Sequence, residues 1–139
     1  MYTRETESAG GVVVNTRGEV LVVSQNGDSW SLPKGRVEEG EDNLATAKRE
    51  IVEESGVKNL TFVKQLPSYK RFSIGKGGKG EDTTKLNTIH MFLFRTEDTE
   101  LSPTDPENPE ARWILKEAVA DLLTHPKDKE FFHRILFEL

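Results

Sequence analysis

The order of apolar and polar positions predicts a chain of strands interrupted by helices. Two apolar runs rich in β-branched residues are joined by the turn-forming residues 15–18, a pattern typical of a hairpin. A later run is strongly apolar and predicts a further strand. The strands predicted in this way cover residues 9–14, 20–24, 60–66 and 86–94, with short ones at 30–32 and 113–115.

One helix is well defined by its periodicity. Between residues 43 and 55 the apolar side chains fall three and four positions apart, which places them on one helical face. Asp42 or Asn43 supplies the N-cap, and Gly56 ends the helix. The pattern therefore predicts a helix over 43–55.

The remainder of the chain completes a mixed architecture. Residues 98–110 hold three prolines and five acidic residues, which favour an irregular surface loop. Two helical stretches follow, over about 116–123 and after Pro126. The alternation of strands and helices predicts an α/β (α+β) sandwich in which helices cover a mixed sheet.

Composition narrows the class of protein. The 139 residues suit one domain spanning 1–139, and the absence of cysteine excludes disulfides, thiolate metal sites and thiol nucleophiles. No apolar run reaches the roughly 18 to 20 residues of a membrane helix, and the first residues lack a signal-peptide core, so we expect a soluble cytoplasmic protein without a membrane partner. A net charge of −5 makes nucleic acid an unlikely partner.

The charges are concentrated in two segments. The segment from Gly35 to Val57 holds seven acidic and three basic residues and carries most of the net negative charge. The segment from Lys70 to Lys85 is basic and contains a loop rich in glycine and lysine. Any phosphate-bearing ligand must therefore be held by local basic groups and not by the overall charge.

Three carboxylates share one face of the predicted helix. Glu50, Glu53 and Glu54 lie three and four positions apart, and like charges at this spacing destabilise a helix by about 0.2–0.5 kcal/mol per pair unless a cation offsets them. Ligands that are all hard oxygen atoms suit Mg²⁺ or Mn²⁺, and a remaining carboxylate could deprotonate a water. The alternative is a solvated face balanced by Lys48 and Arg49, which is common for such triplets.

The wider motif decides between these alternatives. The segment GRVEEGEDNLATAKREIVEESGV resembles the signature of the Nudix hydrolases, Gly, five residues, Glu, seven residues, then Arg-Glu-aliphatic-any-Glu-Glu-any-Gly-aliphatic. Every defined position of this box, residues 35–57, matches. The resemblance extends to the segments AGGVVV, WSLPKG and WILKEA, and it implies a Nudix-type α/β/α sandwich with a mixed central sheet over the whole chain.

The resemblance assigns metal ligands and their supports. Glu53 and Glu54 are the expected ligands of Mg²⁺ or Mn²⁺, with Glu50 as a third ligand or as the base that activates water, and with the main-chain carbonyl of Gly35 as a further ligand. Arg49 is expected to orient the carboxylates, and Glu41 is its expected partner.

The identity of the base stays open at this stage. Relatives of this kind differ in whether the base comes from the box or from a distal loop. Here the distal candidates are Glu107 and Glu110, with Glu97 as a further possibility, although a proline-rich acidic loop is often merely solvated.

Substrate contacts are expected from basic and aromatic residues near the box. Lys34, Lys70 and Arg71 could bind the outer phosphates, and a Lys-rich hairpin tip could assist them or could simply be a solvated loop. Trp30, Tyr69 and His90 are candidates for stacking against a base, whereas Trp113 is interpreted as core. The assisting lysines would be Lys76, Lys79 and Lys85.

Within the Nudix hydrolases, the chain looks most like the diadenosine polyphosphate hydrolases. This likeness rests on the segment LPKG at the start of the box, the strand end Tyr69-Lys70-Arg71, the strand that contains His90 and the short length of the chain. It implies a nucleotide substrate such as diadenosine tetraphosphate and a monomer or homodimer. Other enzymes of this kind stay open: a sanitiser of oxidised nucleoside triphosphates, a diphosphoinositol polyphosphate hydrolase or an RNA 5′ pyrophosphohydrolase. A protein that only binds nucleotides or ADP-ribose as a regulator is the non-enzymatic alternative.

Overall fold

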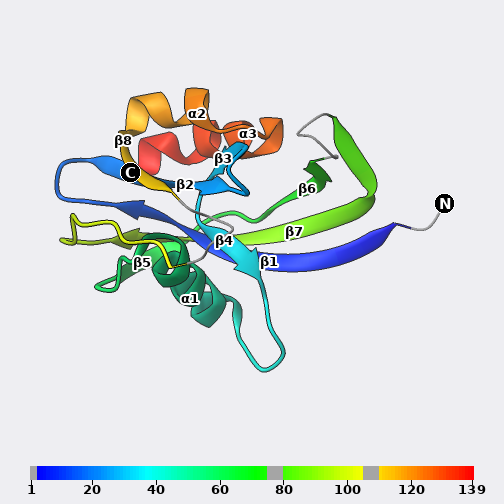
Figure 1. Ribbon diagram of the computed structural model, residues 1–139, viewed down its shortest axis with the longest axis horizontal. Coiled ribbons are helices and arrows are strands. Elements are labelled where there is room, and N and C mark those ends of the chain that lie inside the picture. The colour runs from blue at the N-terminus through cyan, green and yellow to red at the C-terminus, as the bar shows by residue number, and fades with distance from the viewer. Residues whose placement is uncertain (1–2, 75–79, 105–109) are drawn as a thin grey trace.

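A computed structural model describes residues 3–74, 80–104 and 110–139 and shows one mixed sheet of eight strands among them (Figure 1). The central pair is β1 and β7, which run parallel in continuous register from Arg4↔Lys85 to Val14↔Arg95. All other strand pairs are antiparallel. The strands are β1 Arg4–Val14, β2 Glu19–Gln25, β3 Ser29–Ser31, β4 Lys34–Arg36, β5 Thr61–Gln65, β6 Tyr69–Ile74, β7 Glu81–Arg95 and β8 Ala111–Leu115.

Helices cover both faces of this sheet, as the sequence predicts, so the α/β/α sandwich is confirmed (Figure 1). On one face α1 packs through Ala47 and Ile51 against β1 and β7, and on the other face α3 packs through Phe131 and Phe132. Side chains alternate along β1, with Val13 facing α1 and Val12 facing α3. The helical segments are α1 Asn43–Ser55, η2 Lys116–Ala118, α2 Val119–Leu122, α3 Pro126–Ile135 and η3 Leu136–Glu138. Across the described residues, no helix has the length and apolar character needed to cross a membrane.

The main differences from the predicted elements lie at strand ends. The strands predicted over 9–14 and 86–94 each begin about five residues earlier, because their polar first halves pair with one another. The predicted hairpin of β1 and β2 is reduced to the pair Val14↔Val20, since β2 pairs mainly with β3 and β8. Two strands were not expected at all as separate elements: β6, which follows a break at Pro67, and the short strand β4.

Strand β4 lies close against β1 because position 10 has no side chain. Gly10 pairs with Lys34, and a Cβ added at Gly10 would stand 2.1 Å from the carbonyl oxygen of Pro33 and 2.5 Å from the Cβ of Lys34. Both neighbours belong to buried chain that has little room to shift.

We therefore expect Gly10→Ala to destabilise the protein by about 3 kcal/mol, the upper range for overpacking, in a chemical denaturation experiment. Gly18→Ala is the control, because nothing lies within 4 Å of its added Cβ and only its positive φ of 75° opposes the change, which costs about 1 kcal/mol. Equal losses in the two variants would show that β4 does not need this close approach.

Candidate active site

Helix α1 presents the three glutamates of the box in different degrees of burial. The Asp42 carboxylate accepts a hydrogen bond from the Ala45 amide at 2.7 Å and caps the first turn, and Gly56 ends the helix with a φ of 81°. Both ends agree with the sequence prediction. Along this helix the side chain of Glu53 is 45% exposed and that of Glu50 13%, whereas Glu54 is fully buried. The carboxylates therefore form a row that leads from solvent into the protein.

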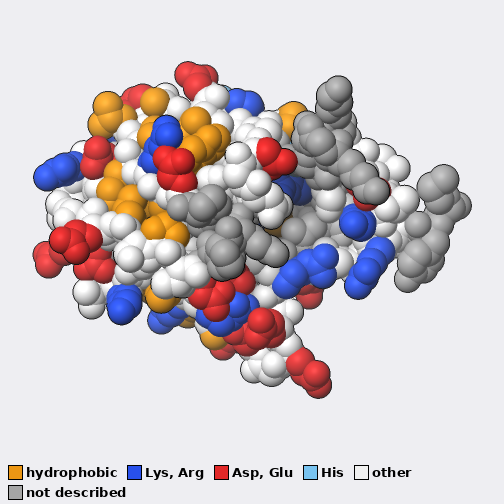
Figure 2. Space-filling view, viewed as in Figure 1, with side chains coloured by type: hydrophobic (Ala, Val, Ile, Leu, Met, Phe, Trp, Pro, Cys, Tyr) orange, Lys and Arg blue, Asp and Glu red, His pale blue; other side chains and the backbone are white. Residues whose placement is uncertain are grey.

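Arg49 holds the acidic segment together. Its Nε and Nη2 atoms donate to the two carboxylate oxygens of Glu41 at 2.6 and 2.9 Å, which is the partnership predicted from the sequence. Its Nη1 atom donates to Glu50 at 2.8 Å and to Glu53 at 3.3 Å. The guanidinium holds the pKa of Glu41 down at about 2 through these hydrogen bonds. Figure 2 shows the acidic side chains gathered over α1 and the loop that precedes it, with basic side chains among them and beside them.

The short strand β4 brings the chain into contact with these carboxylates. The backbone amide of Lys34 donates to Oε2 of Glu54 at 3.1 Å. At the next residue, a Cβ added to Gly35 would stand 2.1 Å from Cδ of Glu50 and within 2.4 Å of both its oxygens. Glycine at position 35 is therefore what allows the Glu50 carboxylate to lie against the backbone of β4.

Burial raises the proton affinity of the two inner carboxylates. Desolvation is the main cause of a raised pKa at Glu50, and at Glu54 desolvation and the nearby Glu50 carboxylate raise the pKa well above its usual value. The buried Lys34 ammonium opposes the shift at Glu54, and burial lowers its own pKa to about 8. Its Nζ atom donates to Ser31 Oγ at 2.8 Å. Such shifted values at one place are typical of a functional site.

The donor atoms present here suit a hard divalent cation. Oε1 of Glu54 is buried and has no hydrogen-bond partner among the described residues, so a strong acceptor is left over at the inner end of the row. In the described ranges no three acidic or histidine side chains are already arranged to hold a metal ion, since Arg49 engages Glu50 and Glu53. All nearby donors are oxygen atoms, which Mg²⁺ and Mn²⁺ prefer. The residues therefore fit such an ion, provided that Glu50 and Glu53 turn from Arg49 towards Glu54.

The substrate residues predicted on β6 and β7 lie on two faces of the sheet. Tyr69 and Arg71 pair with Ile89 and Asn87, and they share the face that packs on α3. Lys70 alternates to the α1 face, and so does His90, whose Nε2 lies 3.1 Å from Oε1 of Glu7. Lys34 projects to the α3 face, because it pairs with Gly10 beside Val12. Lys34, Tyr69 and Arg71 are thus on one face, and Lys70 and His90 on the other.

The remaining candidates have more varied surroundings. The Trp30 ring packs on the core and lies under the Arg112 guanidinium at 4.7 Å. Glu110 is exposed and pairs with the same arginine at 2.7 Å. Lys85 is exposed near Asp82. Trp113 packs against the core cluster under α1, as predicted, and Glu107, Lys76 and Lys79 lie outside the described residues.

Two residues near the site were missed by the sequence analysis. Ser31 contacts the Lys34 ammonium, and the fully buried Asp128 of α3 contacts both Tyr69 and Arg71. An isolated serine gives no signal in a sequence. An acidic residue in the first turn of a helix is so common that the sequence gives no signal that distinguishes Asp128.

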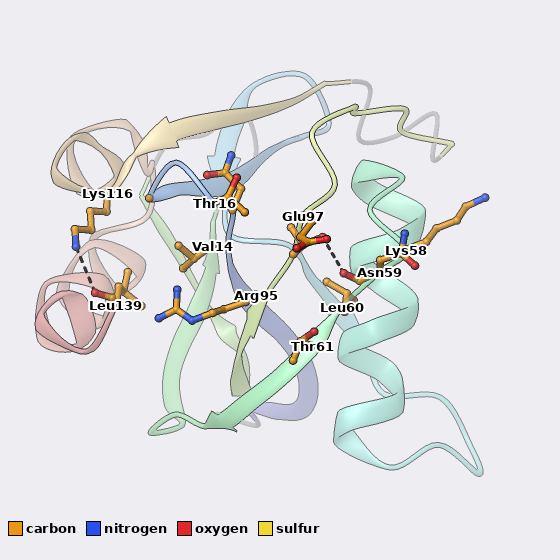
Figure 3. A pocket seen from close by; sticks show the side chains of 13 residues that line it. Val14, Thr16, Lys58, Asn59, Leu60, Thr61, Arg95, Glu97, Lys116 and Leu139 are labelled. Carbon is orange, nitrogen blue, oxygen red and sulfur yellow. Dashed lines mark hydrogen bonds between the residues drawn. The ribbon is translucent and has the colours of Figure 1, made fainter.

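A large cavity lies away from the carboxylates. It has a volume of about 990 Å³ and opens where β1 and β7 end, lined by Val14, Arg95, Lys116 and Leu139 among others (Figure 3). Of the residues predicted for the site, Glu97 alone lines it, so Glu97 is separated from the carboxylate row. This cavity therefore lies at a different place from the carboxylates of the box.

Comparison with known proteins agrees with this geometry. A family model described as NUDIX domain matches residues 4–135. An RNA pyrophosphohydrolase of Pelagibacter ubique is 29% identical, over 82% of this chain and 78% of that protein, and one of Nitrobacter winogradskyi is 29% identical over 93% and 86%. A solved structure of a C. elegans Ap4A hydrolase superposes with a TM-score of 0.73 at 21% identity, over 96% of this chain and 95% of that one.

The fold and the matched length define the class of the protein: the chain belongs to the Nudix family. It is a pyrophosphohydrolase that acts on phosphoanhydride bonds. Nudix hydrolases generally use divalent metal ions, which agrees with the oxygen donors found along α1.

Proposed function

We propose that this protein hydrolyses a phosphoanhydride bond within the polyphosphate chain of a dinucleoside polyphosphate such as diadenosine tetraphosphate. The observation that carries the proposal is the arrangement around β4. On one side of it lie Glu50 and Glu54, and on the other lies the cationic pair Lys34 and Arg71. A polyphosphate chain needs both, since its oxygens gain negative charge as the anhydride breaks.

The carboxylate row would hold the metal ion. We propose Glu53 and Glu54 as ligands of Mg²⁺ or Mn²⁺, together with the carbonyl of Gly35 and, in some states, Glu50. When bound, the ion supplies positive charge for the phosphate oxygens and lowers the pKa of coordinated water. Arg49, whose Nη1 atom donates to both Glu50 and Glu53, would balance their negative charges and orient them.

Glu50 is our choice for the base that takes a proton from the attacking water. It lies against Gly35 and beside Glu54, and burial raises its pKa, which makes its carboxylate a stronger base than a solvated one. The water oxygen forms a bond to phosphorus, the bridging P–O bond breaks, and the leaving phosphate keeps the electron pair. Glu110 stays the alternative base, although its pairing with Arg112 and its exposure favour it less.

The curated relatives favour a second candidate, removal of pyrophosphate from the 5′ triphosphate end of RNA. RNA pyrophosphohydrolases match the chain over 82–93% of its length. Both candidate substrates present a nucleoside 5′ polyphosphate to the same carboxylates. The negative overall charge of −5 favours the smaller dinucleotide, because an RNA chain brings many further phosphates. The cytoplasmic location expected from the sequence, and a monomer or homodimer, belong to the same proposal.

A substrate panel tests the proposal. The protein is incubated with diadenosine tetraphosphate, a 5′-triphosphorylated RNA oligonucleotide, an oxidised nucleoside triphosphate and a diphosphoinositol polyphosphate, each with Mg²⁺, with Mn²⁺ and with chelator. We expect the highest kcat/KM for diadenosine tetraphosphate, with no cleavage in chelator. A higher kcat/KM for the RNA would select the second candidate. Binding of nucleotide or ADP-ribose without any cleavage would instead leave the regulator as the correct function.

A further inference from the structure

A buried carboxylate on α3 contacts the cationic part of the candidate site from behind. Asp128 lies in the first turn of α3 and is fully buried. Its Oδ1 atom accepts a hydrogen bond from the Tyr69 hydroxyl at 2.6 Å, and its Oδ2 atom accepts one from Nη1 of Arg71 at 2.8 Å. The two donors are two residues apart on β6 and share one face, so a single carboxylate joins β6 to α3.

Further contacts make this junction rigid. The Tyr69 ring stacks on Phe131, one helical turn after Asp128, with centroids 4.6 Å apart and an angle of 18°. His125 lies 2.9 Å from the Phe72 carbonyl through Nε2 and accepts from the Lys127 amide through Nδ1, which fixes the neutral Nε2–H tautomer. The start of α3 is therefore attached to β6 at three positions, Tyr69, Arg71 and Phe72.

The arrangement leaves most of the Arg71 guanidinium available. A guanidinium has five N–H donors, and within the described ranges the hydrogen bond to Asp128 is the one recorded for Arg71. Its side chain is 11% exposed, so its direction is set by contacts and not by solvent. A guanidinium fixed by a carboxylate on one side can still bind a phosphate on another through two parallel N–H groups.

Arg71 and Lys34 project to the same face of the sheet, the face that packs on α3. The Arg71 charge is among the causes that lower the pKa of the Lys34 ammonium, and Asp128 opposes it. Lys34 in turn follows directly after Pro33 at the start of β4, and its amide contacts Glu54. Arg71 and Lys34 are therefore two cationic side chains on the α3 face, and the backbone of Lys34 contacts the buried end of the carboxylate row.

We propose that Asp128 is a positioning residue that fixes Arg71 and Tyr69 so that the remaining donors of Arg71, together with Lys34, bind an outer phosphate of the substrate. This inference rests on the proposed function only for the polyphosphate nature of the substrate. It makes α3 part of the substrate site, although none of its residues belongs to the box. If Asp128 only balanced the positive charge of Arg71, its removal would leave more positive charge for the phosphate and would strengthen phosphate binding. If Asp128 positions Arg71, its removal weakens phosphate binding.

The sign of the change in affinity separates these two roles. Asp128→Asn keeps the shape of the side chain and can still accept from Tyr69, but it loses the ionic contact with Arg71. We expect the Kd for inorganic tripolyphosphate, measured by calorimetry in chelator, to rise about tenfold, and the KM of the cleaved nucleotide to rise similarly while kcat changes less than about threefold. Asp121→Asn, the same change at an exposed position on α2, is the control and should leave both unchanged. Unchanged or tighter tripolyphosphate binding in Asp128→Asn would overturn the proposal.

A double-mutant cycle tests whether Asp128 acts through Arg71. Arg71→Gln alone should weaken tripolyphosphate binding at least tenfold, and adding Asp128→Asn to it should have little further effect. If the losses of tripolyphosphate affinity in the two single variants multiply in the double variant, Asp128 acts independently of Arg71, which would contradict the proposal. If Asp128→Asn does not fold, Arg71→Gln and Tyr69→Phe carry the test: unchanged tripolyphosphate binding in Arg71→Gln would overturn the proposal, and a two- to threefold loss in Tyr69→Phe would support it. Because tripolyphosphate binding requires no cleavage, these results stand even if the substrate panel contradicts the proposed function.

Discussion

Glu54→Gln is expected to lower kcat by about 1,000-fold while leaving the fold intact. Glu54 is the fully buried end of the carboxylate row, and its Oε1 atom is the buried acceptor that lacks a partner among the described residues. Loss of one charged ligand removes several kcal/mol of charge stabilisation at the phosphate, and about 4 kcal/mol corresponds to a factor of 1,000. The measurement is steady-state kinetics at saturating Mg²⁺, with circular dichroism as the check of folding. Glu130→Gln, at an exposed position on α3, is the control.

The same variant should be more stable than the wild type when no metal is present. Because the pKa of Glu54 is raised in the folded protein, its contribution to stability is complete below the pKa of the unfolded chain and is lost as the pH rises through the folded value. In chelator, the Tm of the wild type should therefore fall relative to that of Glu54→Gln as the pH rises above the ordinary glutamate pKa of about 4.3. If the Tm values of the two proteins change with pH in the same way, the pKa of Glu54 is not raised by folding. Full activity in Glu54→Gln would contradict its assigned role.

Gly35→Ala is the second change with a large expected effect. The added methyl group would overlap the Glu50 carboxylate, whose carbon lies 2.1 Å from the position of the new Cβ. Glu50 must then turn away, or β4 must move from α1, and either movement displaces groups by an ångström or more. Displacements of this size at reacting groups cost about 100-fold in rate, so we expect kcat to fall by about that factor.

Gly40→Ala provides a matched control within the same box. Nothing lies within 4 Å of the Cβ added at Gly40, but its φ of 84° opposes any side chain. We expect this variant to lose about 1 kcal/mol of stability and to keep its kcat. The two substitutions should therefore affect different properties: Gly35→Ala lowers kcat, whereas Gly40→Ala lowers the stability of the fold. Equal kcat in both variants would argue against a role of Glu50 beside Gly35.

The sequence allowed helix α1 and its core face to be predicted in detail. Its cap at Asp42, its end at Gly56 and the apolar face that carries the buried Ile51 are local features that depend on spacing within a few residues. The partnership of Arg49 with Glu41 is equally local, since both belong to the box. Short-range periodicity and capping rules suffice for such features.

The faces of the long strands could not be predicted in the same way. Tyr69, Lys70 and Arg71 looked like one basic and aromatic group in the sequence, but strand alternation places Lys70 on the α1 face and its two neighbours on the α3 face. Which face carries which neighbour depends on the register of β6 against β7, and hence on contacts between distant segments. The face of His90, a candidate for stacking against a base, could not be predicted for the same reason, and the structure places it beside Glu7 on the α1 face.

Asp128 shows most clearly what could not be predicted from the sequence. It lies 57 positions after Arg71 in the chain, and nothing near it in the sequence distinguishes it from an ordinary helix-start acid. Only the packing of α3 against β6 buries it and joins it to the cationic residues. Long-range pairs of this kind are visible in a structure and not in a hydrophobic pattern.

We propose that carboxylates from one face of α1 bind a divalent ion at the inner end of the row. A Mn²⁺ titration followed by electron paramagnetic resonance tests this directly on the wild type, on Glu54→Gln and on Glu130→Gln. We predict that Glu54→Gln binds Mn²⁺ about 100-fold more weakly than the wild type, a difference of about 2.8 kcal/mol, and that Glu130→Gln binds it equally well. Equal Mn²⁺ affinity in all three proteins would contradict the account.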